Sequence, residues 1–159
     1  MTPDQTQIVQ ETWKQVLPIA DAAGELFYRR LFEIDPSTCE LFRATDIPAQ
    51  RRKLLQMLTV AVRGLDNLDA LASTVEELGR RHAGYGVTDA HYDSVGAALL
   101  WTLQQGLGEA WTPAVAAAWT AAYGFLSGIM RGAAERTHPA RTVRVASVPD
   151  QAARSLPPT

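Results

Sequence analysis

The residue whose surroundings most suggest chemistry is a histidine in the last turn of a predicted helix. His82 lies in the stretch LGRRHAGYGV. The residues before it at helical separations of 4, 7 and 11 are all apolar: Leu78, Val75 and Leu71. These separations place the four side chains on one helical face, so the imidazole faces the apolar side. Gly84 can end the helix in the left-handed conformation, which puts the ring near the negative end of the helix dipole.

An inward histidine can be a hydrogen-bonded core residue or a metal ligand, and the sequence leaves both interpretations open. His91 begins the next predicted helix and His138 lies near the end of the chain, which argues against a site built from several histidines. Cys39 is the only cysteine, which excludes a cysteine-based metal cluster and an internal disulfide. One imidazole suffices as a protein ligand only where another group fills the remaining positions, as a porphyrin does.

A second helical face carries a single amide among apolar residues. Gln50 is followed at separations of 4, 7 and 11 by Leu54, Met57 and Ala61, and a buried amide needs a hydrogen-bond partner. On the preceding helix, Tyr28 is carried toward the core by its apolar neighbours. Tyr28 and Gln50 can satisfy each other as a structural hydrogen bond, or together they can bind a ligand.

Helix-start patterns recur along the chain, and strand patterns are almost absent. Thr2-Pro3-Asp4-Gln5 combines a cap residue, a proline at the first helical position and a glutamine three residues after the cap. We expect an all-α protein of about seven helices, packed at steep angles around one core. The predicted segments cover residues 3–17, 19–34, 36–42, 50–65, 68–82, 89–107 and 113–136.

Composition indicates one globular domain in a reducing compartment. The chain has 159 residues, 47% of them hydrophobic, and a formal net charge of -2, so no nucleic-acid partner is expected. The start lacks a basic segment followed by an apolar one, and the alanine-rich residues 114–122 are interrupted by Trp119 and too short to span a bilayer. We expect a cytoplasmic protein without a membrane partner.

Residues 1–136 form the predicted domain. The proline-containing residues 137–159 are predicted to form a disordered tail.

Three glycines recur at four-residue spacing in the last predicted helix: Gly124, Gly128 and Gly132. Each costs about 1 kcal/mol relative to alanine inside a helix, so the stripe needs a structural reason. We expect a tight helix contact within the chain, with a subunit interface as the alternative. The sequence leaves open whether the protein is a monomer or a homodimer.

Several motifs occur together at characteristic separations. They are FYRRLF with Tyr28, DPSTCELF with Phe42, QRRKLL with Gln50 and Leu54, then His82 and Tyr92. The separations are 14 from Tyr28 to Phe42, 32 from Gln50 to His82, and 10 from His82 to Tyr92. On these residues the chain from about Thr2 to Arg136 resembles the globin family, in particular bacterial single-domain globins and the haem domain of flavohaemoglobins. LGRRHAGYGV followed by VGAALLWTL is also similar to neuroglobin.

The resemblance implies a globin fold around a pocket for haem b, with His82 as the proximal ligand of the iron. It further implies that Phe42 packs on the porphyrin and that Tyr92 lies on the proximal side. Leu54 would border the ligand, and Lys53 would reach a haem propionate unless it is simply an exposed lysine.

On the distal side, the resemblance implies that Tyr28 and Gln50 donate hydrogen bonds to bound O2. Neuroglobin-like proteins have a histidine at the position of Gln50, and glutamine is a poor iron ligand. We therefore expect a five-coordinate ferrous haem with an open site.

The implied activity is reversible binding of O2, with NO and CO as competing ligands. Nitric oxide dioxygenation is a possible second reaction, which would need a separate reductase because Gly84-Tyr85-Gly86 and Gly106-Leu107-Gly108 lack the rest of a dinucleotide-binding motif. The usual proximal glutamate falls at Ala134, with Glu135 one residue later, which puts peroxidase-like chemistry in doubt. The alternatives are a haem-based gas or redox sensor without turnover and a globin scaffold that has lost its haem.

Overall fold

The computed structural model describes residues 1–137, and all regular secondary structure in that part of the chain is helical. The predicted all-α architecture is confirmed, and six of the seven predicted segments are α-helices while the short third one is a 3-10 helix. The elements are α1 (Pro3–Val16), η1 (Leu17–Ile19), α2 (Ala20–Ile34), η2 (Pro36–Phe42), α3 (Ile47–Gly64), α4 (Leu68–Gly84), α5 (Asp89–Leu107), η3 (Gly108–Ala110) and α6 (Pro113–Thr137). The predicted disordered tail lies outside the described residues, apart from Thr137 itself.

Local capping explains where several helices begin. The backbone N–H of Gln5 donates to the Thr2 hydroxyl, and the Thr2 N–H donates to the Gln5 side chain, both at 3.1 Å. This is the capping box that the sequence predicts. Asp46 and Asn67 accept backbone N–H groups at the starts of α3 and α4. These side chains satisfy donors that have no partner within the helix.

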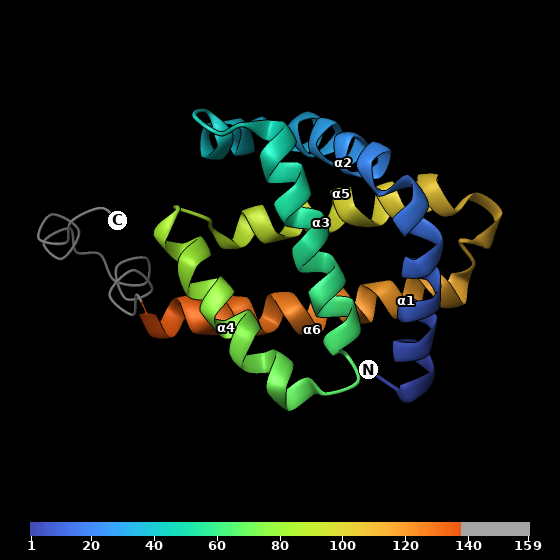
Figure 1. Cartoon of the computed structure of the whole chain (residues 1–159). Coiled ribbons are helices and arrows are strands. Elements are labelled where there is room, and N and C mark those ends of the chain that lie inside the picture. Colours follow the sequence, from blue (N-terminus) through green and yellow to red (C-terminus); the bar gives the residue numbers. More distant parts are fainter. Residues whose placement is uncertain (138–159) are drawn as a thin grey trace, which may run out of the picture.

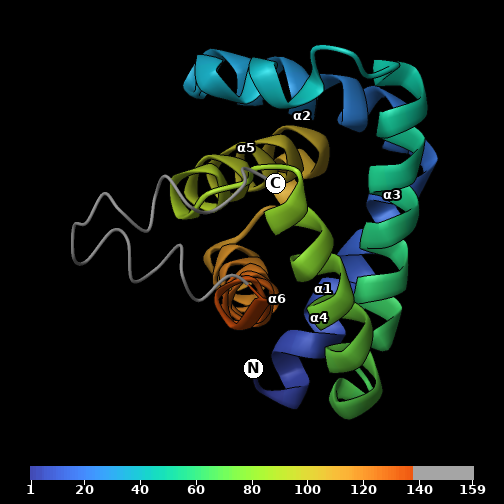
Figure 2. The same cartoon turned by 90° about the vertical axis from the view of Figure 1, so that its left-hand side faces the viewer.

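Helices α3 and α4 form a V that positions the ends of both helices (Figures 1 and 2). They meet closely near the loop that joins them, because a Cβ atom on Gly64 would lie 2.9 Å from Leu71 Cδ1. The helices diverge from there, so the first turn of α3 and the last turn of α4 lie at the open end. Gln50 is in that first turn and His82 in that last turn.

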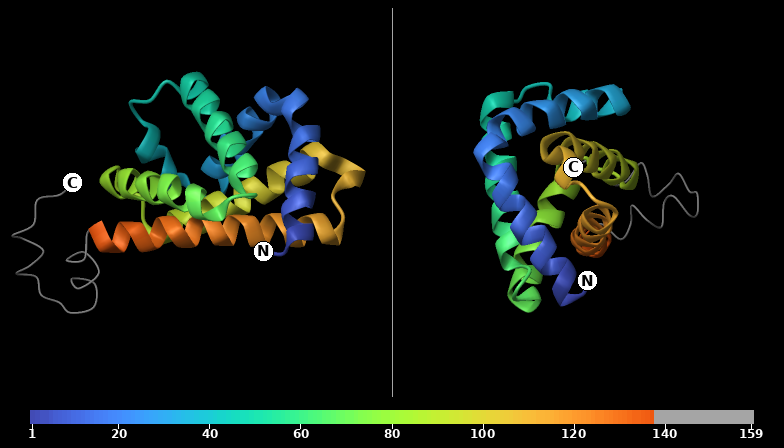
Figure 3. Two further views of the ribbon diagram at one scale, coloured as in Figure 1. Left: turned by 60° about the horizontal axis from the view of Figure 1, so that its bottom comes forward. Right: turned by 90° about the vertical axis from the view of Figure 1, so that its right-hand side faces the viewer.

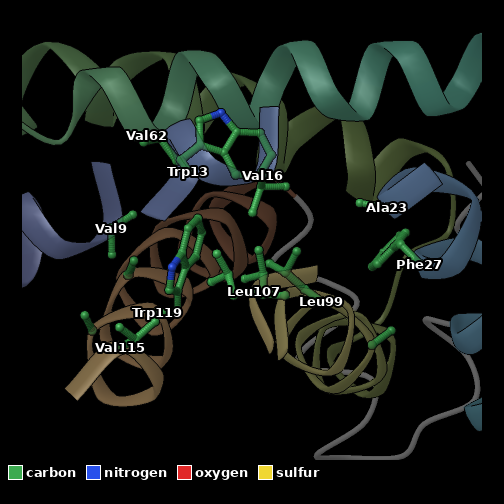
Figure 4. Close-up of a cluster of buried hydrophobic side chains, with 14 of the residues drawn as sticks. Val9, Trp13, Val16, Ala23, Phe27, Val62, Leu99, Leu107, Val115 and Trp119 are labelled. Carbon is green, nitrogen blue, oxygen red and sulfur yellow. The ribbon is translucent and has the colours of Figure 1, made fainter. Parts of the chain in front are cut away.

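The buried cluster drawn in Figure 4 combines side chains of α1, α2, α3, α5 and α6, and Figure 3 shows α1 crossing α6. The rings of Trp13 and Trp119 are 6.0 Å apart at 55°. Trp13 Nε1–H donates to the Thr59 hydroxyl at 3.1 Å, and Trp119 Nε1–H donates to the Thr12 hydroxyl at 2.8 Å. Both buried indole donors are thus satisfied, as an apolar core requires.

The close helix crossings use different glycines from those expected. A Cβ atom on Gly79 of α4 would lie 2.5 Å from the Met130 carbonyl oxygen of α6, and one on Gly96 of α5 would lie 2.7 Å from the Tyr123 ring. The prediction of a tight contact along the α6 stripe was wrong. A Cβ on Gly124 or Gly128 would meet nothing within 4 Å, and one on Gly132 would meet only Arg136 of the same helix. The four-residue spacing shows that the three glycines share one face of the helix. It does not show whether another helix packs against that face.

Helix α6 is also longer than its alanine-rich part suggests. Within the described residues, Pro113–Arg136 is long and apolar enough to cross a membrane by length and composition. The expectation that this region is too short to span a bilayer was based on residues 114–122 alone. The helix continues to Thr137. However, Ala118, Trp119 and Ala122 are buried within the fold, and α6 contacts α1, α4 and α5. A core helix meets the same criterion, and we assign α6 to the core.

The α4–α6 crossing predicts unequal effects of two glycine-to-alanine changes. Gly79→Ala should lower the free energy of unfolding by about 1–3 kcal/mol, because its methyl group would overlap the Met130 backbone. Gly128→Ala is the matched control in an open position, and it should raise stability by about 0.5–1 kcal/mol through helix propensity. Urea unfolding of both variants measures this difference. Equal effects would contradict the crossing geometry.

Candidate functional site

A cavity of about 220 Å³ lies at the open end of the V and extends between the helices. Its wall is largely apolar, with a few polar side chains that come from separate helices, as in small-molecule binding sites. The wall includes six of the residues singled out in the sequence: Tyr28, Phe42, Gln50, Leu54, His82 and Tyr92. Lys53 does not line the cavity and is exposed.

The imidazole of His82 is held in one tautomer. Its Nδ1 lies 2.9 Å from the Leu78 carbonyl oxygen. A carbonyl can only accept, so Nδ1 carries the proton and Nε2 keeps a free lone pair when the ring is neutral. Burial lowers the pKa of His82, the bond to Leu78 partly raises it, and the nearby Arg81 cation lowers it further. The ring is therefore neutral at pH 7, with Nε2 able to act as a ligand.

The end of α4 differs in one detail from the expected geometry. The left-handed residue is Gly86, at φ +89°, rather than Gly84, which is still helical. The N–H of Gly86 donates to the Ala83 carbonyl, and the N–H of Val87 donates to the His82 carbonyl, both at 3.1 Å. These bonds close the last turn and fix the backbone that carries His82.

Tyr28 lies on the α2 side of the cavity and is 4% exposed. Burial raises the pKa of its hydroxyl to about 12, and a side-chain hydrogen bond with Gln50 partly offsets this. The ring packs edge-on against Phe27 and Phe42, at 5.0 and 5.4 Å between centroids. Tyr28 therefore remains a protonated phenol in a fixed orientation. The hydrogen bond between Tyr28 and Gln50 fits both expectations, a structural pair and a ligand-binding pair.

Arg51 helps to position the cavity wall, although no sequence pattern predicted this role. A Cβ atom on Gly24 of α2 would lie 2.4 Å from Arg51 Cγ, so the arginine stem occupies the space that the glycine leaves. The Arg51 guanidinium then reaches Asp21 at 3.2 Å. This contact holds the first turn of α3, and with it Gln50, against α2. In the sequence, Gly24 inside the predicted helix 19–34 could have indicated that another side chain packs closely there.

His91 also lines the cavity, although the sequence assigned it only to a helix start. The Thr88 N–H donates to His91 Nδ1 at 3.0 Å, and His91 Nε2 lies 3.4 Å from the Ser37 hydroxyl. Ser37 in turn donates to Asp35, which also accepts from Ser94 at 2.7 Å. This polar chain ties η2, which carries Phe42, to the start of α5.

On the α5 side, Tyr92 is 6% exposed, and its ring stacks near that of His82, 6.4 Å away at 24°. Its hydroxyl is buried without a hydrogen-bond partner among the described residues. Ala134 offers no acceptor, and Glu135 is exposed. The free imidazole nitrogen on a largely apolar cavity fits a mainly apolar ligand that carries its own metal.

Residues 1–137 contain no group of three or more His, Cys, Asp or Glu side chains that could hold a metal ion by themselves. In that part of the chain, a metal could use His82 only together with ligands from another group.

Comparison with known proteins gives consistent matches. A family model described as Globin matches residues 25–130. A flavohemoprotein of Vibrio cholerae is 34% identical over 120 residues, which are 72% of this chain and 30% of that protein. Anaerobic nitrite reductase HBII of Casuarina glauca is 29% identical over 136 residues, 77% of this chain and 85% of that protein. The chain thus spans less than a third of the flavohemoprotein.

A solved structure shares the fold. The crystal structure of a hexacoordinated heme protein from an anhydrobiotic tardigrade superposes with a TM-score of 0.78. The match covers 85% of this chain and 96% of the tardigrade chain. Sequence identity is 18%, so this likeness concerns the architecture alone.

The His82 environment predicts a pH dependence of stability in protein freed of any bound ligand. The pKa of His82 is lower in the folded chain than the value of 6.5 expected in the unfolded chain. When the pH falls below about 6.5, the unfolded chain therefore binds more protons than the folded chain. The contribution of His82 is therefore complete above pH 6.5 and is lost as the pH falls toward the folded pKa. Urea unfolding between pH 7.5 and 5 should show a shallower loss in His82→Gln than in the native chain. The same dependence of unfolding free energy on pH in both proteins would contradict a lowered pKa of His82 in the folded chain.

Proposed function

The chain belongs to the globin family, and we propose that it binds haem b through His82 and binds O2 reversibly, with NO and CO as competing ligands. The observation that carries this proposal is the His82 tautomer, which presents a free Nε2 on an apolar cavity. Bound haem would supply the iron that coordinates a diatomic gas. Phe42 and Leu54 of the cavity wall would contact the macrocycle and the gas, respectively.

The distal residues support hydrogen bonding to a gas ligand. A side-chain hydrogen bond links Gln50 to Tyr28 and lowers the pKa of the phenol. We propose that the amide N–H of Gln50 donates to the phenol oxygen. The Tyr28 O–H then remains free to donate into the cavity. A hydrogen bond to a partly charged acceptor contributes about 1.5–3 kcal/mol, which corresponds to roughly a 10- to 100-fold slower ligand escape.

The same residues support a five-coordinate ferrous state. Gln50 lines the cavity, and as the proposed distal residue it offers only an amide, which is a weak ligand for iron. Burial keeps the Tyr28 hydroxyl protonated, since its pKa is about 12. A protonated phenol donates a hydrogen bond rather than a metal-ligand bond. We therefore propose an open sixth position.

The proximal side favours reversible binding over O–O bond cleavage. A carboxylate on the second imidazole nitrogen makes a histidine ligand more basic. In this chain His82 Nδ1 donates to a main-chain carbonyl, and Glu135 is exposed. Nitric oxide dioxygenation is accordingly the secondary activity in our proposal, and it would depend on a separate reductase.

The proposal is tested by absorption spectra of the ferric, ferrous and CO-bound forms. The native protein should contain one haem per chain and give a five-coordinate high-spin ferrous spectrum. His82→Ala should lose most of the haem or its ferrous spectrum. His91→Ala is the matched control, because His91 lines the cavity but uses Nδ1 to accept from Thr88. Native spectra and haem content in His82→Ala would refute the assignment.

A second test concerns the distal hydroxyl. Tyr28→Phe removes the donor but keeps the ring, so O2 should dissociate about 10- to 100-fold faster in stopped-flow displacement by CO. Tyr85→Phe makes the same chemical change on an exposed ring, 68% accessible, and should leave the rate unchanged. An unchanged rate in Tyr28→Phe would show that Tyr28 and Gln50 are only a structural pair.

A further inference from the structure

Tyr92 contacts a cation as well as the proposed axial histidine. The Arg131 guanidinium of α6 lies over the Tyr92 ring, 5.2 Å from its centroid. Tyr92 is held in place from the same helix, because the Tyr123 hydroxyl donates to the Tyr92 carbonyl at 2.6 Å. The aromatic ring thus links a positive charge to the surroundings of His82.

The charges around Tyr92 are ordered from inside to outside. Arg131 donates to Asp93 at 2.9 Å, and the side chains are 30% and 77% exposed, respectively. The cation is therefore the inner member of the pair, and the carboxylate is the outer one. Arg131 Nε is buried without a hydrogen-bond partner among the described residues. The bond to Asp93 raises the pKa of Arg131, which stays charged.

A second carboxylate, Asp89 at the start of α5, also acts on Tyr92 and Arg131, but Arg131 has the larger effect on the pKa of Tyr92. Ala134 continues the α6 face that lines the cavity, at separations of 11, 7 and 4 from Tyr123, Ser127 and Met130. It carries no acceptor, and Glu135 is exposed. The charged side chain that acts on His82 itself is another cation, Arg81. Arg81 also pairs with the exposed Glu77 at 3.6 Å. At Tyr92 and at His82, the larger effect of a nearby charge on the pKa therefore comes from a cation, Arg131 and Arg81 respectively.

We infer that Arg131 is a positioning residue that acts through Tyr92 to keep the surroundings of His82 positive and so favours the ferrous over the ferric form of bound haem. This inference rests on the proposed function. Reduction removes one positive charge from the iron, so a nearby cation stabilises the reduced state more than the oxidised one. Groups around a metal ligand tune its potential in this way.

The test is the midpoint potential of the haem-loaded protein, measured by spectroelectrochemistry. At the potential where the native protein is half reduced, Arg131→Gln should show a ferrous-to-ferric ratio at least threefold lower. For a one-electron couple this corresponds to a midpoint potential about 30 mV lower. Arg131→Lys keeps the charge and should stay close to the native value. Arg136→Gln is the matched control, because it removes an exposed α6 cation that pairs with Glu76 and should have no effect.

A variant of opposite sign separates electrostatics from structure. Asp93→Asn removes only the outer carboxylate, which is too exposed to be needed for folding, and should raise the midpoint potential. If the pair were merely structural, both Arg131→Gln and Asp93→Asn would shift the potential in the same direction. That result, or equal potentials in Arg131→Gln and Arg136→Gln, would overturn the inference. Intact haem binding through His82 in these variants would leave the proposed function standing, whereas a native protein without haem would remove both.

Discussion

The hydrogen bond from His82 Nδ1 to the Leu78 carbonyl is the interaction on which the site depends. It forms within one turn of α4, at 2.9 Å, and it fixes which ring nitrogen keeps its lone pair. Because burial also lowers the pKa of the ring, the free nitrogen is available at neutral pH. The same bond uses a neutral acceptor, so it orients the imidazole without making it strongly basic.

That hydrogen bond is useful only if the end of α4 has a fixed place in the fold. Gly79, three residues before His82, lets the α4 backbone touch the backbone of α6 at Met130. At the other end of the helix, Leu71 packs against Gly64, where α3 and α4 meet. The first contact holds α4 against α6 and the second holds it against α3. Together they fix the place of His82 across the cavity from Tyr28 and Gln50.

Much of this arrangement could be predicted from local patterns. Caps and apolar spacing gave the helices, and separations of 4, 7 and 11 placed His82 and Gln50 on inward faces. The covered glycines could not be predicted, because spacing does not reveal which helix lies opposite, and Gly79 and Gly96 make the close contacts in place of Gly124 and Gly128. Arg51 and Arg131 were missed for a related reason. Each acts by lying against a residue of another helix, Gly24 or Tyr92, and no local motif encodes that pairing.

The proposed function requires a bond between the Nε2 atom of His82 and the iron of haem. Resonance Raman spectroscopy of the ferrous protein, prepared with and without nitrogen-isotope labelling of histidine, detects this bond. We expect an iron–histidine stretching band that shifts to lower frequency with the label. A ferrous haem protein without such a band, or with a band that does not respond to labelled histidine, would contradict it.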